Sequence, residues 1–313
     1  MPFTKKLQKF NATIRTVEVG TGDKTTTLGG GNTLPFYSFD APTANKAKIG
    51  IEISDLGLAH EPDCIKEVYA GCETVADMAK KAITIEGVDF LCLRLEGGDP
   101  NGENRPVEEL VAVAKEVADA VDFPLVVEGC KNVEKDAELL SKVAEALQGK
   151  NVLLMSAKEE NYKNIGAAAG LAYNQLVGAE SAVDINLAKQ LNVLLKQLGV
   201  DSGKVVMNVG SSAAGYGFDY LISTLDRVKA AALGQNDDSL LMPIITPVAS
   251  ETWSVKESVA TEEDAPGWGC VVERAIDMEV ETAVACLACG SDAVILKHPT
   301  SVATVSKLIN ALS

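Results

Sequence analysis

Residues 88–95, VDFLCLRL, and the five that follow them at 96–100, EGGDP, carry the pattern that decides the fold. A short apolar run stops at a cluster of glycine and acidic residues, and a helical pattern begins at Val107. Apolar residues continue from there at steps of three and four to Val121, while charged residues such as Glu108 fall on the opposite side. The stretch therefore predicts a buried strand, a polar loop and an amphipathic helix, in that order.

The same unit recurs along the whole chain. The other apolar runs are rich in Val, Ile and Leu and lack polar alternation, which is typical of a parallel sheet covered on both faces. They span Ile49 to Leu56, Pro124 to Val127, Asn151 to Met155, Leu176 to Ala179, Val205 to Val209, Leu241 to Val248 and Ala293 to Leu296. Further helical patterns lie at Val75 to Ile83, Val133 to Leu147, Asp184 to Leu198, Tyr220 to Leu233, Ile276 to Leu287 and Val302 to Leu312. Gly199 is expected to end one of these helices with a left-handed cap. Eight strand–helix units predict an α/β fold, a (β/α)8 TIM barrel over residues 49–313.

Residues 1–48 precede the barrel pattern as an N-terminal extension. Thr13 to Val19 alternates like a strand, and the glycine tract Gly29 to Gly31 follows it. A phosphate-binding loop is disfavoured because no Gly-Lys-Ser/Thr or Gly-x-Gly-x-x-Gly spacing opens a helix here. We therefore expect a turn, or a hairpin that closes the bottom of the barrel.

A second irregular region, residues 249–269, separates the seventh strand from its helix. It is about 21 residues long without expected secondary structure, and both tryptophans, Trp253 and Trp268, lie in it. Long loops of this kind are usually functional or disordered. The tryptophans suit either an exposed anchor for a ligand or protein, or packing of the loop onto the barrel.

The composition limits the class of protein. A chain of 313 residues with 47% hydrophobic residues suits one barrel with an extension, and no Pro/Gly/Ser-rich linker divides it. The net charge of -16 argues against nucleic acid as a partner, because binding to phosphates needs a basic surface. No apolar run reaches the roughly 18 residues needed to span a bilayer, and Met1 to Phe10 lacks a signal stretch. We expect a cytoplasmic protein without membrane contact.

Seven cysteines raise the question of a metal centre. Cys92 lies within an expected strand, and Cys286 and Cys289 lie on the last turns of an expected helix. Iron–sulfur and zinc sites need closely spaced or paired cysteines in loops, which this spacing does not supply. We expect most of the cysteines to be buried as small hydrophobic residues, and disulfides are disfavoured in the cytoplasm.

Catalytic and binding residues of such barrels lie where strands end and loops begin. The candidates at these ends are Asp55, Glu96, Asp99, Glu128, Lys158, Asn208, Gly210, Ser211, Ser212, Tyr216, Thr246, Lys297 and His298. Lys158 or Lys297 could form a Schiff base in an aldolase-like enzyme, although pairing with a carboxylate such as Glu159 is commoner. His298 could act as a general base or a metal ligand, but with His60 as the only other histidine a three-histidine metal site is excluded. These strand ends show no coherent catalytic set.

Four blocks of sequence resemble one known family. They are residues 29–37 (GGGNTLPFY), 49–55 (IGIEISD), 93–100 (LRLEGGDP) and 209–217 (VGSSAAGYG). The blocks are similar to the small, delta-type subunit of the corrinoid/iron–sulfur protein associated with carbon monoxide dehydrogenase/acetyl-CoA synthase. The resemblance covers the whole chain.

That resemblance implies a non-catalytic barrel that pairs with a larger subunit and helps to enclose a cobalamin at their interface. In the family, a methyl group passes from methyltetrahydrofolate, through a separate methyltransferase, to acetyl-CoA synthase in the reductive acetyl-CoA (Wood–Ljungdahl) pathway. The iron–sulfur cluster belongs to the larger subunit, which agrees with the cysteine spacing of this chain. Neither histidine stands in the Asp-x-His-x-x-Gly motif of a cobalt-ligating histidine, so we expect no such ligand from this chain.

The mouth of the barrel would then cover one face of the corrin. The candidate corrinoid-facing residues are Asn208, Gly210, Ser211, Ser212, Tyr216 and Thr246. The small residues allow close approach, and the amide and hydroxyl groups offer hydrogen bonds to propionamide side chains. An alternative is a pterin-dependent methyltransferase of the same barrel class, in which Glu96, Asp99 and Asn208 would bind methyltetrahydrofolate. Against it stands the lack of an Asp-Asn-Asp set on successive strands.

Overall fold

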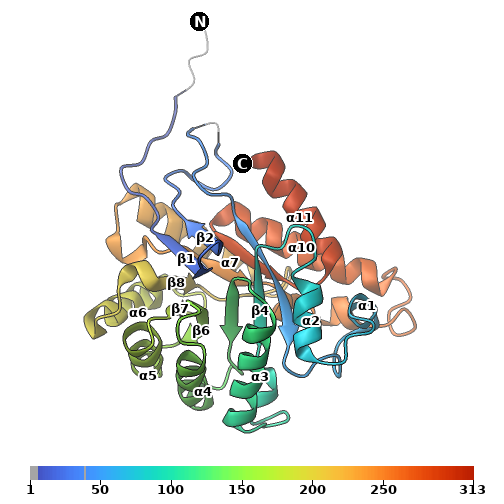
Figure 1. Cartoon of the computed structure of the whole chain (residues 1–313). Coiled ribbons are helices and arrows are strands. Elements are labelled where there is room, and N and C mark those ends of the chain that lie inside the picture. Colours follow the sequence, from blue (N-terminus) through green and yellow to red (C-terminus); the bar gives the residue numbers. More distant parts are fainter. Residues whose placement is uncertain (1–5, 39) are drawn as a thin grey trace, which may run out of the picture.

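A computed structural model describes residues 6–38 and 40–313. Within these residues, eight parallel strands pair in the order β8-β7-β6-β5-β4-β3-β10-β9, and a bridge between Met207 and Ile244 joins the two outer strands. The sheet is thereby closed into a barrel (Figure 1). Its strands are β3 (Lys48–Ser54), β4 (Phe90–Arg94), β5 (Leu125–Glu128), β6 (Leu153–Ala157), β7 (Leu176–Glu180), β8 (Val205–Asn208), β9 (Ile245–Pro247) and β10 (Ala293–Leu296). The (β/α)8 barrel predicted from the sequence is confirmed.

Helices connect the strands and cover the outside of the barrel (Figure 1). They are α1 (Asp63–Val68), α2 (Val75–Ala82), α3 (Val107–Ala120), α4 (Val133–Ala146), α5 (Tyr162–Ile165), α6 (Ile185–Leu198), α7 (Phe218–Lys229), α8 (Ala249–Thr252), α9 (Lys256–Val259), α10 (Val271–Cys289) and α11 (Pro299–Leu312). Short π-helical turns at Gly166–Ala172 and Ala230–Gly234 extend α5 and α7. Helix α6 ends at Gly199, whose φ of 106° is the left-handed cap that the sequence predicts. In the part of the chain that the structure describes, no helix combines the length and the apolar character needed to cross a membrane.

An antiparallel hairpin lies at the end of the barrel from which the strands start (Figure 1). It consists of β1 (Thr16–Thr21) and β2 (Lys24–Gly29). Val17, Val19 and Leu28 are buried with side chains of the barrel interior. The backbone N–H of Gly20 donates to the carbonyl oxygen of Asn151 over 2.9 Å, which ties the hairpin to the start of β6. The hairpin that the sequence predicts at the barrel bottom is confirmed, whereas the boundary at residue 48 stays a prediction and residues 1–5 lie outside the described residues.

The barrel interior is apolar through most of its depth and charged at its carboxyl end. Alternate residues of a strand face the same side of a sheet. Phe90 and Cys92 of β4 belong to the interior apolar cluster, and Arg94 is the next residue on that side. In β5, Val126 is likewise followed by Glu128. The strands therefore carry charged groups into the upper level of the barrel.

The region 249–269 contains more structure than the sequence predicts. Helices α8 and α9, of four residues each, occupy its first half. Trp253 between them is 8% exposed and stacks on His298 with 6.1 Å between ring centroids, whereas Trp268 is 43% exposed. Trp253 therefore packs onto the barrel, whereas Trp268 lies at the surface. The two helices give no sequence signal because four residues are too few to show a helical period.

The cysteines are all unpaired, and their burial follows the sequence prediction in part. Cys92, Cys130 and Cys286 are buried, and Cys270 is exposed. The remaining cysteines are half-buried, which makes the expectation that most would be buried only partly correct.

Candidate functional site

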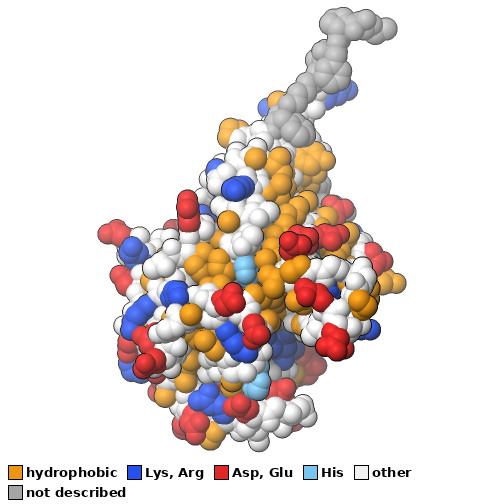
Figure 2. All heavy atoms as spheres, turned by 90° about the vertical axis from the view of Figure 1, so that its right-hand side faces the viewer, with side chains coloured by type: hydrophobic (Ala, Val, Ile, Leu, Met, Phe, Trp, Pro, Cys, Tyr) orange, Lys and Arg blue, Asp and Glu red, His pale blue; other side chains and the backbone are white. Residues whose placement is uncertain are grey.

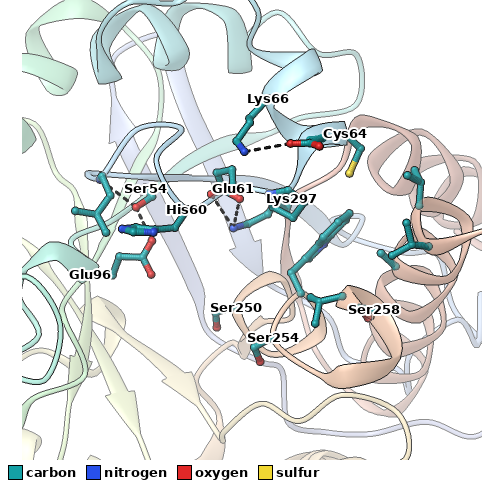
Figure 3. A pocket seen from close by; sticks show the side chains of 18 of the residues that line it. Ser54, His60, Glu61, Cys64, Lys66, Glu96, Ser250, Ser254, Ser258 and Lys297 are labelled. Atoms are coloured by element: carbon teal, nitrogen blue, oxygen red, sulfur yellow. Dashed lines mark hydrogen bonds and ion pairs between the residues drawn. The ribbon is translucent and has the colours of Figure 1, made fainter. Parts of the chain in front are cut away.

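A layer of paired charges lies at the carboxyl ends of the barrel strands (Figure 3). Nζ of Lys297, directly after β10, lies 2.9 and 3.0 Å from the two carboxylate oxygens of Glu61 and 3.3 Å from Oε1 of Glu52. The guanidinium of Arg94, at the end of β4, lies 2.9 Å from Oε2 of Glu96 and 3.8 Å from Oε1 of Glu52. The layer forms because parallel strands bring their carboxyl ends to the same end of the barrel.

Glu279 of α10 fixes the end of β10. Its Oε1 accepts a hydrogen bond from the backbone N–H of Lys297 over 2.6 Å, and its Oε2 accepts one from the backbone N–H of His298 over 3.2 Å. Burial raises the pKa of Glu279, while these hydrogen bonds act in the opposite direction. The buried carboxyl group thus holds the backbone from which Lys297 reaches into the charged layer.

The charge of Lys297 decides its chemistry. Burial by itself lowers the pKa of this lysine, but the charges of Glu52 and Glu61 outweigh burial, and the net effect is a raised pKa. A lysine that forms a Schiff base must lose its proton, which requires a lowered pKa. The aldolase-like role considered for Lys297 is therefore not supported. Lys158 is also paired, with its Nζ 3.1 Å from Oε1 of Glu180 at the end of β7.

Glu128, at the end of β5, has a pKa far above the usual value for a glutamate. Burial, followed by the charge of Glu52, raises the pKa of Glu128 to about 7. Its Oε2 atom has no hydrogen-bond partner among the described residues. This carboxyl group therefore changes its charge near neutral pH.

A cavity of about 620 Å³ opens beside the charged layer (Figure 3). Its charged side is formed by Arg94, Glu96, Glu61 and Lys297, together with Ser54. Its apolar lining comes from Leu56, Pro62, Trp253, Val259, Val271, Val272 and Ala275. Three serines of the α8–α9 region, Ser250, Ser254 and Ser258, also line it. The cavity thus joins a charged side to an apolar one.

The six predicted corrinoid-facing residues, all of which the structure describes, lie outside this cavity. Asn208 is 3% exposed, its Nδ2 donates to Oγ of Ser156 over 3.3 Å, and its Oδ1 accepts from the backbone N–H of Gly210 over 3.0 Å. Ser211 donates through Oγ to the carbonyl oxygen of Pro247 over 2.6 Å. Asn208 and Ser211 therefore shape the start of the loop after β8.

Ser212 and Tyr216 lie further along the same loop. The hydroxyl of Ser212 donates to the carbonyl oxygen of Tyr216, and the hydroxyl of Tyr216, a residue that is 49% exposed, donates to Oε2 of Glu257 over 2.5 Å. The loop 209–217 is thereby connected to α9. Its role towards a corrinoid stays a prediction.

Thr246, the sixth predicted corrinoid-facing residue, lies in β9. It is fully buried, and its hydroxyl lies 2.7 Å from that of Ser291, just before β10. Ile245, its neighbour in β9, belongs to the apolar interior cluster, so Thr246 faces the opposite side of the sheet. Strand alternation, applied to β9, indicates this orientation. A contact of Thr246 with a corrinoid stays a prediction.

His298 has a structural role in the same region. Its Nδ1 accepts a hydrogen bond from the backbone N–H of Thr300 over 3.1 Å, which caps the start of α11. Burial lowers the pKa of His298. Among residues 6–38 and 40–313, no group of three His, Cys, Asp or Glu side chains could hold a metal ion.

Sequence reasoning missed Glu52, Arg94 and Glu61 as members of the site. A signal existed for Glu52 and Arg94, because each is a charged residue inside an otherwise apolar run. Arg94 lies two positions from Cys92 of the interior cluster, and Glu52 lies two positions from Gly50, which faces Phe90 of that cluster. Glu61 gave no signal, since it lies in a loop before α1 and meets Lys297 only through the closure of the barrel.

Comparison with known proteins identifies similar sequences over almost the whole chain. The family model described as CO dehydrogenase/acetyl-CoA synthase delta subunit matches residues 16–306. The chain is 32% identical to acetyl-CoA decarbonylase/synthase complex subunit delta 1 of Methanosarcina thermophila, over 99% of this chain and 71% of that protein. It is 34% identical to the delta subunit of the same complex from Archaeoglobus fulgidus, over 94% of this chain and 65% of that protein.

Solved structures show a similar fold at low sequence identity. Dihydropteroate synthase of Xanthomonas albilineans with 4-aminobenzoic acid aligns with a TM-score of 0.59 at 13% identity, over 95% of this chain and 98% of that chain. Dihydropteroate synthase of Thermus thermophilus aligns with a TM-score of 0.55 at 13% identity, over 95% of this chain and 100% of that chain. At this identity the likeness shows the fold alone.

Proposed function

Because this chain belongs to the delta-subunit family of CO dehydrogenase/acetyl-CoA synthase, we propose that it is the smaller partner in a corrinoid protein and that its barrel mouth covers one face of a corrinoid. The larger subunit would hold most of that cofactor and an iron–sulfur cluster. The observation that carries the proposal is the family match over residues 16–306. The chain spans 71% and 65% of the length of two relatives, so the activity and partners of the whole complex form part of the proposal.

The loop 209–217 is the part of the mouth that fits a corrinoid. Six of its first seven residues are Gly, Ala or Ser, and the seventh is Val209. A flat macrocycle can therefore approach the loop backbone closely. The backbone N–H and C=O groups of the loop suit the propionamide groups at the edge of a corrin, and the hydroxyl of Tyr216, which donates to Glu257, can still accept a hydrogen bond.

The histidines of the chain support a corrin face without a protein ligand from this side. His60 lies at the rim of the cavity with its Nε2 3.5 Å from Oε1 of Glu103, and His298 caps α11 through Nδ1. The partners of both histidines thus lie outside the loop 209–217. The corrinoid, when bound, supplies the cobalt that carries the methyl group, and this chain's part is to cover it and limit access of water.

The proposed complex works in the cytoplasm. Its methyl group comes from methyltetrahydrofolate through a separate methyltransferase and goes to acetyl-CoA synthase, in the reductive acetyl-CoA pathway. Since donor and acceptor sites must both reach the cofactor, the partner's corrinoid-binding part must move relative to this barrel.

Co-expression with the larger subunit of a corrinoid/iron–sulfur protein tests this proposal. The absorbance spectrum and corrinoid content of the purified complex are compared with those of the larger subunit alone. We expect stable co-purification, and corrinoid bands that weaken or shift when this chain is omitted. Unchanged bands without this chain would reduce its role to that of a scaffold and contradict the shared site.

Calorimetry separates the proposal from the alternative of a pterin-dependent methyltransferase. The isolated chain is titrated with methyltetrahydrofolate in the absence of partners. We expect no saturable heat, because a subunit that only covers a corrinoid has no need of the folate. Tight binding by the isolated chain would favour the methyltransferase.

A further inference from the structure

The cavity beside the charged layer is lined by residues other than those of the loop 209–217, to which the corrinoid contact is assigned above. We propose that it is a separate binding site for a small molecule with a flat apolar body and N–H donor groups, neutral or singly positively charged. An amino-substituted heteroaromatic ring is the simplest molecule of this class. The inference does not depend on the corrinoid proposal.

The size and lining of the cavity fit such a body. Its volume of about 620 Å³ lies within the range of roughly 300–1,000 Å³ that is usual for small-molecule sites. The indole of Trp253 offers an aromatic plane, and Val259 and Val272 add aliphatic surface. Figure 2, which faces the side of the molecule bearing α1, α10 and α11, shows a band of apolar side chains bordered by acidic and basic ones.

The charges at the cavity favour a donor-bearing ligand over an anion. Four carboxylates outnumber the three cations that line the cavity. The cations are Lys66, Arg94 and Lys297, and each of them pairs with at least one of the carboxylates Asp63, Glu96, Glu61 and Glu52, the last of which lies outside the lining. An added anion would meet this excess of negative charge, whereas a neutral or cationic ligand would not. The chain as a whole has a net charge of -16, so its overall electrostatic field also disfavours the binding of an anion.

Acceptor capacity remains on Glu96. Its Oε1 accepts a hydrogen bond from Ser54 over 2.5 Å, and its Oε2 faces Arg94 at 2.9 Å. A carboxylate has about four lone-pair sites, so further N–H donors can bind these oxygens. Figure 3 shows Ser54, Glu96, Glu61 and Lys297 side by side at one side of the cavity.

Ser258 provides an independent sign of a missing polar partner. This residue lines the cavity and is 3% exposed, yet its Oγ has no hydrogen-bond partner within the described residues. Buried hydroxyl groups in folded proteins are almost always hydrogen-bonded. A polar ligand in the cavity would supply that bond after a rotation of the side chain.

Two compounds that share one ring system test the inference. The complete chain is titrated with 2-aminobenzimidazole and, separately, with benzimidazole-2-carboxylate, with calorimetry and tryptophan fluorescence as readouts. We expect saturable binding of the amine with quenching of Trp253, and affinity for the carboxylate lower by at least about tenfold, the value of one charge-assisted hydrogen bond. Equal affinity for both compounds, or binding of neither, would overturn the proposal.

Matched variants locate the bound amine. Val272→Trp fills the cavity with a larger side chain, and Val193→Trp adds the same side chain on α6, where Val193 is 39% exposed. Binding should be lost in the first variant and kept in the second. Glu96→Gln, which keeps the shape of the side chain, should weaken binding by about tenfold and serves as the test if Val272→Trp does not fold. Unchanged affinity in Glu96→Gln, or in a folded Val272→Trp, would place the amine elsewhere and refute the site.

Discussion

Lys297 and Glu61 form a buried ion pair across 236 positions of the sequence, with Nζ of the lysine 2.9 Å from Oε1 of the glutamate. The pair links the end of β10 to the loop that leads from β3 to α1. Because β10 and β3 are neighbours in the sheet, this ion pair joins the last strand of the barrel to the first. It therefore holds the two ends of the barrel sequence together at the mouth.

Replacement of Lys297 by methionine tests the contribution of this pair to stability. Lys297→Met leaves the carboxylates of Glu52 and Glu61 buried without their shared cation, so we expect a loss of about 3–5 kcal/mol in the free energy of unfolding. Urea unfolding followed by circular dichroism measures it. In the control Lys66→Met, the lysine removed pairs with exposed Asp63, and the loss should stay below about 1 kcal/mol. Equal losses in the two variants would contradict a structural role for the buried pair.

Glu128 should make the protein less stable as the pH rises towards neutrality. The pKa of Glu128 is about 7 in the folded protein and about 4.3 in an unfolded chain. Between these values the folded state retains a proton that the unfolded state has released, so stability falls as pH rises through this window and levels off above about 7. Glu128→Gln removes the effect.

The measurement compares Glu128→Gln with the parent chain by urea unfolding at pH 5 and pH 8. Relative to the parent, the variant should gain on the order of 3 kcal/mol between the two pH values. Glu138→Gln, at an exposed position on α4, serves as the control and should show no such gain. Parallel pH profiles for Glu128→Gln and the parent would show that Glu128 does not titrate in this range.

Gly50 should not tolerate a side chain, because Phe90 of the neighbouring strand occupies the space next to it. A Cβ atom at Gly50 would lie 2.1 Å from Cε2 of Phe90. We expect Gly50→Ala to lower stability by about 1–3 kcal/mol, measured by thermal unfolding, and Phe90→Leu in the same chain to restore part of it. At Gly102 the nearest atom is 3.6 Å away, so Gly102→Ala should change stability by about 0.5 kcal/mol at most. A neutral Gly50→Ala would mean that the barrel interior can repack around the added methyl group.

A bulky residue on the loop 209–217 should interfere with the proposed corrinoid contact. Ser212→Trp places a large ring where a macrocycle must approach, so the complex with the larger subunit should retain less than about one tenth of the corrinoid of the parent complex, the effect of about 1.4 kcal/mol. Corrinoid content after gel filtration is read from the absorbance spectrum. Val193→Trp on α6 is the matched control and should retain the full amount. Full retention in Ser212→Trp would remove this loop from the corrinoid site.

The sequence predicts the strands and helices of this fold better than it predicts which side chains meet at the mouth of the barrel. Apolar runs and helical periods are local patterns, and they located the strands, most helices and the cap at Gly199. The contact of Lys297 with Glu61 depends on barrel closure, which no local pattern encodes. The orientation of Thr246, away from the interior cluster, was not evident because a run buried on both faces hides which residues face inwards. Helices α8 and α9 were missed because each has only four residues.

The hairpin β1–β2 covers the end of the barrel from which the strands start, opposite the charged layer. Val17, Val19 and Leu28 fill that end with apolar side chains, whereas Arg94 and Lys297 bring charged groups to the carboxyl end. Glu128 lies at the carboxyl end of β5, on the side of the charged layer. A subunit that docks over the carboxyl end would cover Glu128 further and slow the exchange of its proton with the solvent.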